Sequence, residues 1–243
     1  MRNIAHRGAS SHAPENTLAA FRLAAKMGAQ FIETDLRLTA DGHIVALHDA
    51  IVNRTTDGRG RVSRMGLAKV RTLDASAHFA GSNKLQSFAG ERVPTLEDVL
   101  DFARTAGIGS YLELKSRPGM GLEERVVRAL RSAKLVSPAV VISFHAASLR
   151  AIRELNPRVA TGFLVERFGT RAVQRALEIG ARQLLPRADR ATPALLAAAR
   201  EAGLEIVVWT VNETPQMRRL IAAGVDGIIT NYPDRLAALM PSR

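Results

Sequence analysis

The sequence predicts an α/β protein of the (β/α)₈ TIM-barrel class with a small insertion after the second strand. Its 243 residues suit one such barrel, and a hydrophobic fraction of 47% is enough to fill one large core. A unit of helical stretch, glycine and short apolar run recurs along the chain, as parallel βαβ units require. The glycines at the expected helix ends, where a left-handed cap is favoured, are Gly28, Gly107, Gly180, Gly203 and Gly224.

The barrel strands are predicted from short runs rich in aliphatic and β-branched residues, and their number matches the eight that close a barrel. In chain order these are 3–6, 31–36, 111–115, 139–144, 159–164, 182–186, 205–210 and 227–230. A further run, 44–48, follows the second strand too closely for a helical crossover. Because 39–42 carries a turn signal, we interpret 44–48 as the second arm of a hairpin.

Residues from about 50 to 93 interrupt this alternation. The segment contains turn signals, such as 57–60 and 81–83, and few periodic apolar positions. The regular pattern resumes at Thr95, which with Asp98 resembles a capping box at a helix start. We therefore expect residues 1–243 to form a single domain that carries an insertion at about 50–93.

Composition limits the possible partners. The formal net charge is +11, but the basic residues are scattered and aromatic residues make up only 5%, so no nucleic-acid partner is expected. No apolar run is long enough for stable membrane insertion, and the first residues lack the apolar stretch of a signal peptide, so a cytoplasmic location is expected. The absence of cysteine excludes disulfides and thiolate metal sites. The oligomeric state is not predicted.

Carboxylates in apolar strands are the strongest functional signal. Glu33 and Asp35 lie two residues apart and therefore share one side of a strand, and Glu113 occupies a similar strand. Strands of a barrel bring such groups together at their carboxyl ends. Acidic oxygens without cysteine favour one divalent ion, Mg²⁺ or Ca²⁺, with Mn²⁺ possible. The alternative is a surface ion-pair network, such as Glu113 with Lys115 or Glu33 with Arg37.

Cations and imidazoles follow the same strand ends. Arg7 offers a planar fork and Lys115 a point charge, and both suit phosphate oxygens. His6 and His48 come from two separate strand ends, which suits a general acid and a general base on opposite sides of a scissile bond. Both histidines also fit as metal ligands or as structural residues hydrogen-bonded to the backbone.

Other candidates carry weaker signals. Trp209 suits an apolar wall for the alcohol portion of a substrate, or a cap on the barrel core. His145 follows the predicted fourth strand and is either a rim residue or a helix-start residue. The histidines assigned to loops, turns or the insertion are His12, His43 and His78.

Taken together, these motifs resemble the glycerophosphodiester phosphodiesterase family, and the resemblance spans nearly the whole chain in the family's order. Its motifs are His6-Arg7-Gly8, Pro14-Glu15-Asn16-Thr17, Glu33-x-Asp35, Thr39-x-Asp41-Gly42, His48-Asp49, Phe88 to Leu96, Glu113-x-Lys115, Ser143-Phe144, Trp209-Thr210-Val211-Asn212 and Gly224 to Ile228. One departure is Asn231, where the family commonly has aspartate after the threonine.

The resemblance implies a TIM barrel with an insertion after strand two, and it implies site roles that agree with those inferred above. Glu33, Asp35 and Glu113 would hold Mg²⁺ or Ca²⁺. His6 and His48 would be the general acid and base, with the cations Arg7 and Lys115 on the phosphate.

The resulting hypothesis is metal-dependent hydrolysis of a small-molecule glycerophosphodiester to sn-glycerol 3-phosphate and an alcohol such as choline or ethanolamine. The nucleophile is either water or the glycerol 2-hydroxyl, which would form a cyclic phosphate first. The alternatives are a lysophospholipase D-type phosphodiesterase that acts on lysophospholipids, and a non-catalytic phosphate-binding barrel.

Overall fold

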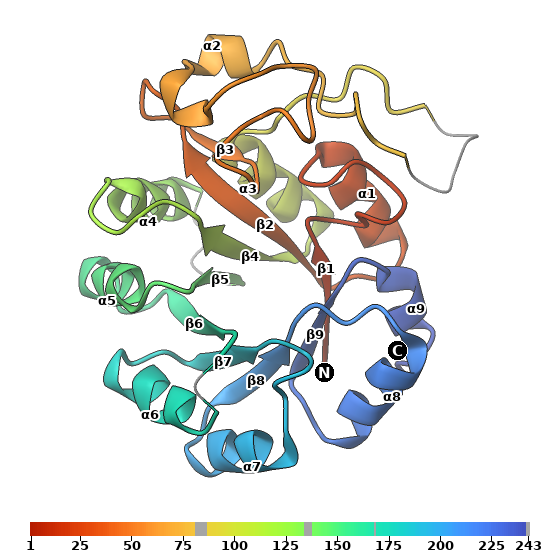
Figure 1. Cartoon of the computed structure of the whole chain (residues 1–243), viewed down its shortest axis with the longest axis vertical. Helices are drawn as coiled ribbons and strands as arrows, with labels where there is room; N and C mark the ends of the chain where they lie inside the picture. The colour runs from red at the N-terminus through yellow and green to blue at the C-terminus, as the bar shows by residue number, and fades with distance from the viewer. Residues whose placement is uncertain (81–86, 134–137, 168, 242–243) are drawn as a thin grey trace.

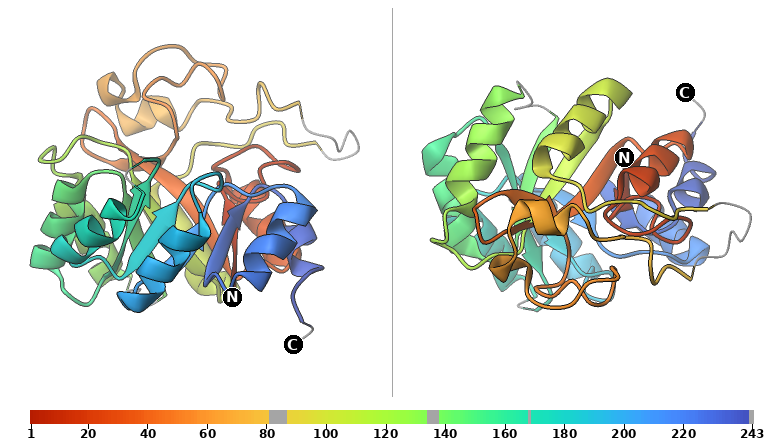
Figure 2. Two further views of the ribbon diagram at one scale, coloured as in Figure 1. Left: turned by 60° about the horizontal axis from the view of Figure 1, so that its bottom comes forward. Right: turned by 90° about the horizontal axis from the view of Figure 1, so that it is seen from above.

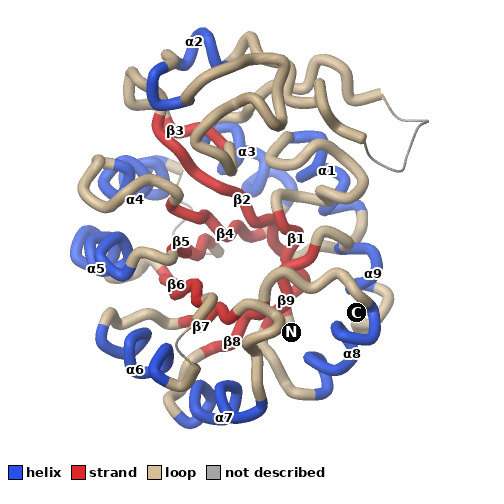
Figure 3. Tube along the Cα trace, viewed as in Figure 1, coloured by secondary structure: helices blue, strands red, loops and turns tan. Residues whose placement is uncertain are grey.

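The chain forms a closed parallel β-barrel surrounded by helices, as the computed structural model shows (Figure 1). The structure describes residues 1–80, 87–133, 138–167 and 169–241. The strands form the inner ring and the helices the outer layer (Figure 3). The predicted (β/α)₈ TIM-barrel class is therefore confirmed.

The barrel closes because β1 pairs with both β9 and β2. Every pair of neighbouring strands around the ring is parallel. Around the ring the order is β1-β9-β8-β7-β6-β5-β4-β2, and β3 pairs antiparallel with β2 as the outer arm of the predicted hairpin. The strands are β1 Arg2–His6, β2 Phe31–Leu38, β3 Ile44–Ala46, β4 Gly109–Leu114, β5 Ala139–Ser143, β6 Ala160–Val165, β7 Gln183–Pro186, β8 Glu205–Val208 and β9 Gly227–Thr230.

All the helices except α2 follow a strand and pack their apolar faces against the outside of the barrel. They are α1 Leu18–Lys26, α2 Leu67–Val70, α3 Leu96–Ala106, α4 Leu122–Ser132, α5 Ala146–Leu155, α6 Arg171–Glu178, α7 Pro193–Glu201, α8 Thr214–Ala222 and α9 Pro233–Ala237. The predicted capping box is present, since the Asp98 amide donates to Thr95 Oγ1 at 3.1 Å and the Thr95 amide donates to Asp98 Oδ2 at 2.9 Å. In the described residues, no helix has the length and apolarity needed to cross a membrane.

The segment between β3 and α3 contains the 3₁₀ helix Val62–Arg64 and the short α2. It has its own small apolar cluster, which includes Val52, Val70 and Val93. The segment stands over the end of the barrel that lies away from both termini (Figure 2). Positions 81–86 of the predicted insertion lie outside the described residues.

The alternating side chains inside the barrel explain where polar groups gather. One cluster of apolar side chains fills the inside of the barrel. Its buried residues are Ile4, Tyr111, Val140, Ile142, Leu164, Leu185, Val207 and Ile229. On β2, Phe31 is followed at the same face by Glu33 and Asp35, and on β4 Tyr111 is followed by Glu113. Strand pairing places Glu33 level with His6, the last residue of β1, and Asp35 level with Glu113 near the end of β4, so the acids lie at the mouth of the barrel next to the apolar core.

Candidate functional site

The predicted site residues meet at one cavity in the mouth of the barrel. Its volume is about 220 Å³. The residues of the sequence prediction that line it are His6, Arg7, Glu33, His48, Glu113, Lys115 and Trp209. Asp35 does not line this cavity but lies beside it, fully buried and in contact with both Arg7 and Lys115.

The acids are brought together by strand pairing. Asp35 is the register partner of Glu113 on β4, and Glu33 is the partner of His6 on β1. All three acids are buried, and one carboxylate oxygen from each lies within 4.8 Å of the others. This buried arrangement argues against the alternative of a solvent-exposed ion-pair network, and such a cluster of oxygen ligands can hold a metal ion.

The electrostatics of the cluster show that its negative charge is only partly compensated. Burial and the repulsion of Asp35 raise the pKa of Glu33 well above its usual value and that of Glu113 to about 7. Burial acts in the same direction on Asp35, but the charges of Lys115 and Arg7 outweigh it and lower its pKa to about 2. In addition, Asp35 Oδ1 and Glu113 Oε1 are buried without a hydrogen-bond partner of good geometry.

The two predicted phosphate ligands contact these acids directly. Lys115 Nζ lies 2.6 Å from Glu113 Oε1 and 3.2 Å from Asp35 Oδ1, and Arg7 Nε lies 3.2 Å from Asp35 Oδ2. These contacts are ion pairs, as the surface-network alternative anticipated, but they are buried at the mouth. The Arg7 amide also donates to Glu33 Oε2 at 2.9 Å, which fixes that carboxylate from the backbone.

Backbone geometry at the end of β1 explains this contact. Arg7 adopts a left-handed conformation with φ of 56°, and Gly8 follows with φ of 81°. A Cβ atom at Gly8 would lie 2.6 Å from the Cβ of Ala20 on α1. Glycine is therefore required for the close turn that directs the Arg7 amide toward the site.

Two residues that hold site groups in place, one an acid and the other a cation, were quoted within a motif but not assigned a role from the sequence. Asn16 Nδ2 donates to Asp35 Oδ2 at 2.9 Å, while Asn16 Oδ1 accepts from the Thr34 hydroxyl at 2.8 Å. Glu15 bridges Arg7 and Arg54, each by contacts of 3.0 Å or less. The only sequence feature that could have indicated these two residues is the motif Pro14-Glu15-Asn16-Thr17 in which they lie.

Each candidate histidine is held through Nδ1. His6 Nδ1 lies 2.7 Å from Asn231 Oδ1, and His48 Nδ1 lies 2.7 Å from Asp49 Oδ1. Because amide and carboxylate oxygens accept hydrogen bonds, this pairing assigns the proton to Nδ1 and leaves Nε2 available in both rings. Asp49 is held in turn by Arg54 Nε at 2.6 Å.

Both imidazoles favour the neutral form in this environment. Burial, helped by the positive charge of Arg7, lowers the pKa of His6 to about 4. Burial also lowers the pKa of His48, and the neighbouring Arg7 acts in the same direction. His6 Nε2 lies 3.9 Å from Glu33 Oε2, which makes it a neighbour of the acidic cluster.

The sequence left two interpretations of Trp209 open, a wall of the substrate site or a cap on the barrel core, and its location is compatible with both. It lines the mouth cavity and also packs against the apolar cluster inside the barrel. Its indole Nε1 donates to the Leu185 carbonyl at 2.7 Å. Two further lining residues, Phe144 and Glu166, had no predicted role.

The other histidines lie away from this cavity. His145 is the exposed residue that precedes α5, so the helix-start interpretation holds. His12 lies 3.9 Å from Asp234, and His78 lines a separate surface cavity. His43 lines an outer groove between helices.

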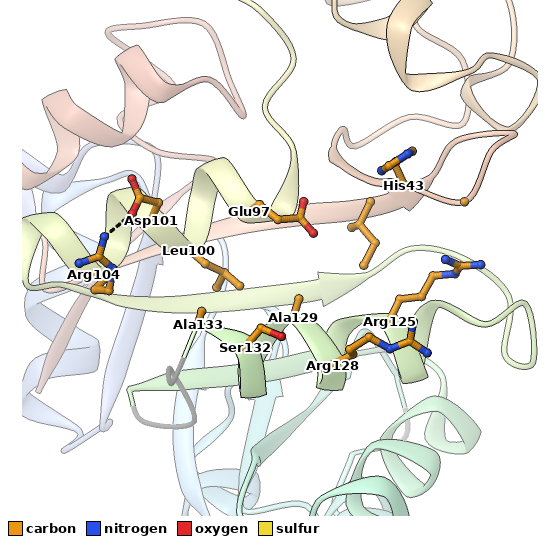
Figure 4. Close-up of a pocket in the computed structure, with 12 residues that line it drawn as sticks. His43, Glu97, Leu100, Asp101, Arg104, Arg125, Arg128, Ala129, Ser132 and Ala133 are labelled. Atoms are coloured by element: carbon orange, nitrogen blue, oxygen red, sulfur yellow. Dashed lines mark hydrogen bonds and ion pairs between the residues drawn. The ribbon is translucent and has the colours of Figure 1, made fainter.

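That outer groove, between α3 and α4, has a volume of about 510 Å³ and is larger than the mouth cavity (Figure 4). Glu97 and Asp101 of α3 line it on one side, and Arg125 and Arg128 of α4 line it on the other (Figure 4). Arg104 pairs with Asp101 within α3. The groove lies outside the barrel and contains none of the buried carboxylates, so size alone does not identify the site.

Comparison with known proteins agrees with this geometry. Residues 6–235 match the profile of the "Glycerophosphoryl diester phosphodiesterase family". A glycerophosphodiester phosphodiesterase of Caldanaerobacter subterraneus is 37% identical over 239 residues, which cover 98% of this chain and 96% of that protein. A glycerophosphodiester phosphodiesterase of Bacillus subtilis is 36% identical over 95% of this chain and 83% of its own length.

Solved structures show the same likeness. A phosphodiesterase of Oleispira antarctica, solved in complex with its product sn-glycerol-3-phosphate, is 30% identical and superposes with a TM-score of 0.86. The match covers 97% of this chain and 94% of that one. The glycerophosphodiester phosphodiesterase of Agrobacterium tumefaciens is also 30% identical, with a TM-score of 0.84 over 97% and 98% of the two chains.

Proposed function

The chain belongs to the glycerophosphoryl diester phosphodiesterase family and is an enzyme of that class, and we propose that it hydrolyses small glycerophosphodiesters to sn-glycerol 3-phosphate and an alcohol. The observation that carries this proposal is the convergence of three buried acids, two cations and two imidazoles on one cavity. The product complex of the Oleispira antarctica phosphodiesterase supports the substrate class.

The acidic cluster would hold one divalent ion, Mg²⁺ or Ca²⁺, with Mn²⁺ as a possible substitute. Glu33, Asp35 and Glu113 would be its ligands. The raised pKa of Glu33 and Glu113 is what a site built for an added cation would show, since two cations are too few to neutralise three buried acids. When bound, the ion would neutralise the acids and polarise a phosphoryl oxygen as a Lewis acid.

Arg7 and Lys115 would bind the phosphate oxygens. Both cations are mostly buried at the cavity, and their positive charges face the space that a diester must enter. Each would stabilise the additional negative charge that develops on the phosphoryl group during the reaction. Lys115 also neutralises Asp35 and Glu113, so its charge serves the acids and the substrate at the same edge of the cavity.

His6 and His48 would perform the proton transfers. Asn231 and Asp49 hold their Nδ1 atoms, which leaves both Nε2 atoms free to exchange protons with the substrate. One ring would take a proton from the nucleophile and the other would give one to the leaving oxygen. The phosphate anion itself favours the protonated form of whichever imidazole acts as the acid.

We also propose that residues 1–243 act as one catalytic domain, with the segment at about 50–93 as an insertion that supports the site. Arg54, from this segment, contacts both Asp49 and Glu15 and so connects the insertion to His48 and Arg7. The segment would thereby hold one histidine and one cation in position.

The direct test is hydrolysis of glycerophosphocholine, glycerophosphoethanolamine and glycerophosphoglycerol by the purified protein, with and without EDTA. We expect sn-glycerol 3-phosphate from at least one diester, loss of turnover in EDTA, and recovery with Mg²⁺, Ca²⁺ or Mn²⁺. If none of the three diesters yielded sn-glycerol 3-phosphate, the proposal would be contradicted. Undiminished turnover after complete removal of metal would contradict the metal requirement.

The same assay in oxygen-18 water, combined with a search for a cyclic glycerol phosphate, separates the two possible nucleophiles. Both routes end with one oxygen-18 atom in the glycerol phosphate, because water either attacks the diester directly or opens the cyclic phosphate. A cyclic phosphate that forms without label before the labelled product appears identifies the glycerol 2-hydroxyl as the nucleophile, and its absence at every time point identifies water.

A further inference from the structure

The half of the mouth opposite the acidic cluster has a different chemistry. Phe144 follows β5, Glu166 follows β6 and Trp209 follows β8, and all three line the same cavity. The acids and cations of the proposed phosphate site come from β1, β2 and β4 and the residues that follow them. A diester that places its phosphate among those groups has an alcohol arm left to accommodate, and this second half faces it.

The two aromatic rings form a corner. The centroids of Phe144 and Trp209 are 5.4 Å apart with an interplanar angle of 81°. The hydrogen bond from Trp209 Nε1 to Leu185 fixes the indole, and Phe144 is 37% exposed although it is a large apolar residue. An exposed aromatic face at a cavity carries partial negative charge and attracts cations.

The Phe144 ring already lies near a cation. Lys115 Nζ is 5.9 Å from its centroid, on the side toward the phosphate site. The ring therefore marks the boundary between the two halves of the cavity.

Glu166 adds a full negative charge to this half. Within residues 1–80, 87–133, 138–167 and 169–241, its carboxylate has no ion-pair partner within 4.0 Å. Arg187, whose charge interacts with Glu166 at longer range, is instead engaged by Asp189 through two contacts of 2.7 Å. Glu166 is thus an acid that lines the cavity, and the arginine near it, Arg187, is already paired with Asp189.

We propose that Phe144, Trp209 and Glu166 form a subsite for a cationic alcohol, so that the enzyme prefers diesters with a quaternary ammonium or ammonium group in the leaving alcohol. The inference rests on the proposed function and adds the charge of the preferred substrate to it. A cation seated in this corner meets two aromatic rings and one carboxylate, while its phosphate reaches Arg7 and Lys115 on the other side. The alternative role for Glu166 is to accept hydrogen bonds from the glycerol hydroxyls.

The test compares glycerophosphocholine with its neutral isostere, the 3,3-dimethylbutyl diester of glycerol 3-phosphate. The two substrates have nearly the same shape, and only the charge of one atom differs. We expect the wild-type kcat/KM to favour glycerophosphocholine by about tenfold, mainly through KM, because the contacts to the alcohol are made equally in the ground state and in the transition state. In Glu166→Gln and in Phe144→Leu, this ratio should fall to within about threefold of one.

Glu178→Gln is the matched control. It makes the same change of charge on the outer surface of α6, where Glu178 pairs with Arg175 3.0 Å away. The control should keep the wild-type ratio. A circular dichroism melt of each variant confirms that it is folded.

Three results are decisive. Equal kcat/KM for the two diesters in the wild type would overturn the subsite while leaving the proposed function intact. An equal loss on both diesters in Glu166→Gln would also overturn it, since this is what a contact with the glycerol hydroxyls produces. Hydrolysis of neither diester, nor of any other glycerophosphodiester, would overturn the proposed function itself.

Discussion

Acidic side chains lie at both ends of the barrel, and the two ends differ in how far neighbouring cations balance the negative charge. At the end where β1 begins, Arg2 lies 2.6 Å from Glu205, which also contacts Arg182 at 3.1 Å. Burial alone would raise the pKa of Glu205, but Arg2 outweighs it and holds the pKa below its usual value. This acid has enough positive charge around it to stay ionised.

At the mouth the balance is reversed. Three buried acids share two cations, and the pKa of two of these acids is raised instead of lowered. The first arrangement stabilises a fold and the second leaves negative charge for a ligand to neutralise. The comparison teaches that a buried acid indicates function when its neighbours fail to stabilise its charge.

The largest effect is expected from removal of either imidazole at the mouth. His6→Ala and His48→Ala should each lower kcat by about 10²–10⁴-fold, because each removes one positioned proton-transfer group. Metal affinity, measured by calorimetric titration with Mn²⁺, should change little. Near-normal turnover in either variant would remove that histidine from the mechanism.

The next largest effect is expected from Glu113→Gln. Loss of one metal ligand should reduce kcat/KM by about 10²–10³-fold and weaken Mn²⁺ binding in the same titration. The substitution also removes one of the repelling charges. A variant that binds Mn²⁺ as tightly as the wild type would show that Glu113 is not a ligand.

Part of this comparison was accessible from the sequence. The i and i+2 spacing of Glu33 and Asp35 predicts a shared face, and eight short runs predict the barrel that brings Glu113 beside them. The strand ends were predicted to within about two residues, since β4 begins at 109 and β8 ends at 208. Local patterns were sufficient here because strand periodicity and the barrel's closure fix the arrangement.

The remainder depends on contacts between distant positions. Asn231 is hydrogen-bonded to His6, which lies 225 residues away in the sequence. From the sequence alone, Asn231 was recognised only as a departure from the family pattern. The pairing of Arg2 with Glu205 is equally distant. Glu166 has no motif around it, and its importance appears only when the cavity shows which residues surround it. No local spacing encodes these contacts.

A moderate effect is expected from metal removal, and it should depend on pH. The folded-state pKa of Glu113, about 7, lies above its unfolded value, so Glu113 stabilises the metal-free protein at pH 5 and this contribution is lost as the pH rises through 7. His6, whose folded-state pKa of about 4 lies below its unfolded value, acts in the opposite direction, so the prediction concerns the metal-induced change in Tm at each pH and not the Tm itself. Asp35 stays ionised over this range in both states and contributes no change. We expect added Mg²⁺ or Mn²⁺ to raise Tm by roughly 5 °C or more at pH 8 and by much less at pH 5.

Glu113→Gln is the control for this pH dependence. Without metal, the change in its Tm from pH 5 to pH 8 should be less negative than that of the wild type, because one of the two acids with a raised pKa is gone and only Glu33 remains. A metal-induced rise in Tm that is the same at both pH values would contradict the charge imbalance assigned to the mouth.

The smallest effect is expected at the other end of the barrel. Glu205→Gln removes a partly exposed ion pair and should lower the free energy of unfolding by about 1 kcal/mol, or Tm by roughly 2–4 °C. The kcat of the folded variant should equal that of the wild type. A large loss of kcat without a loss of Tm would end the distinction between a structural end and a functional end.

The central claim is that Glu33, Asp35 and Glu113 surround one divalent cation, and anomalous diffraction from a crystal grown with Mn²⁺ tests it most directly. We predict a single strong anomalous peak in the mouth with one oxygen of each of the three acids as a ligand. A mouth without a peak, in which Lys115 and Arg7 alone neutralise the acids, would contradict it, as would a peak held by other residues.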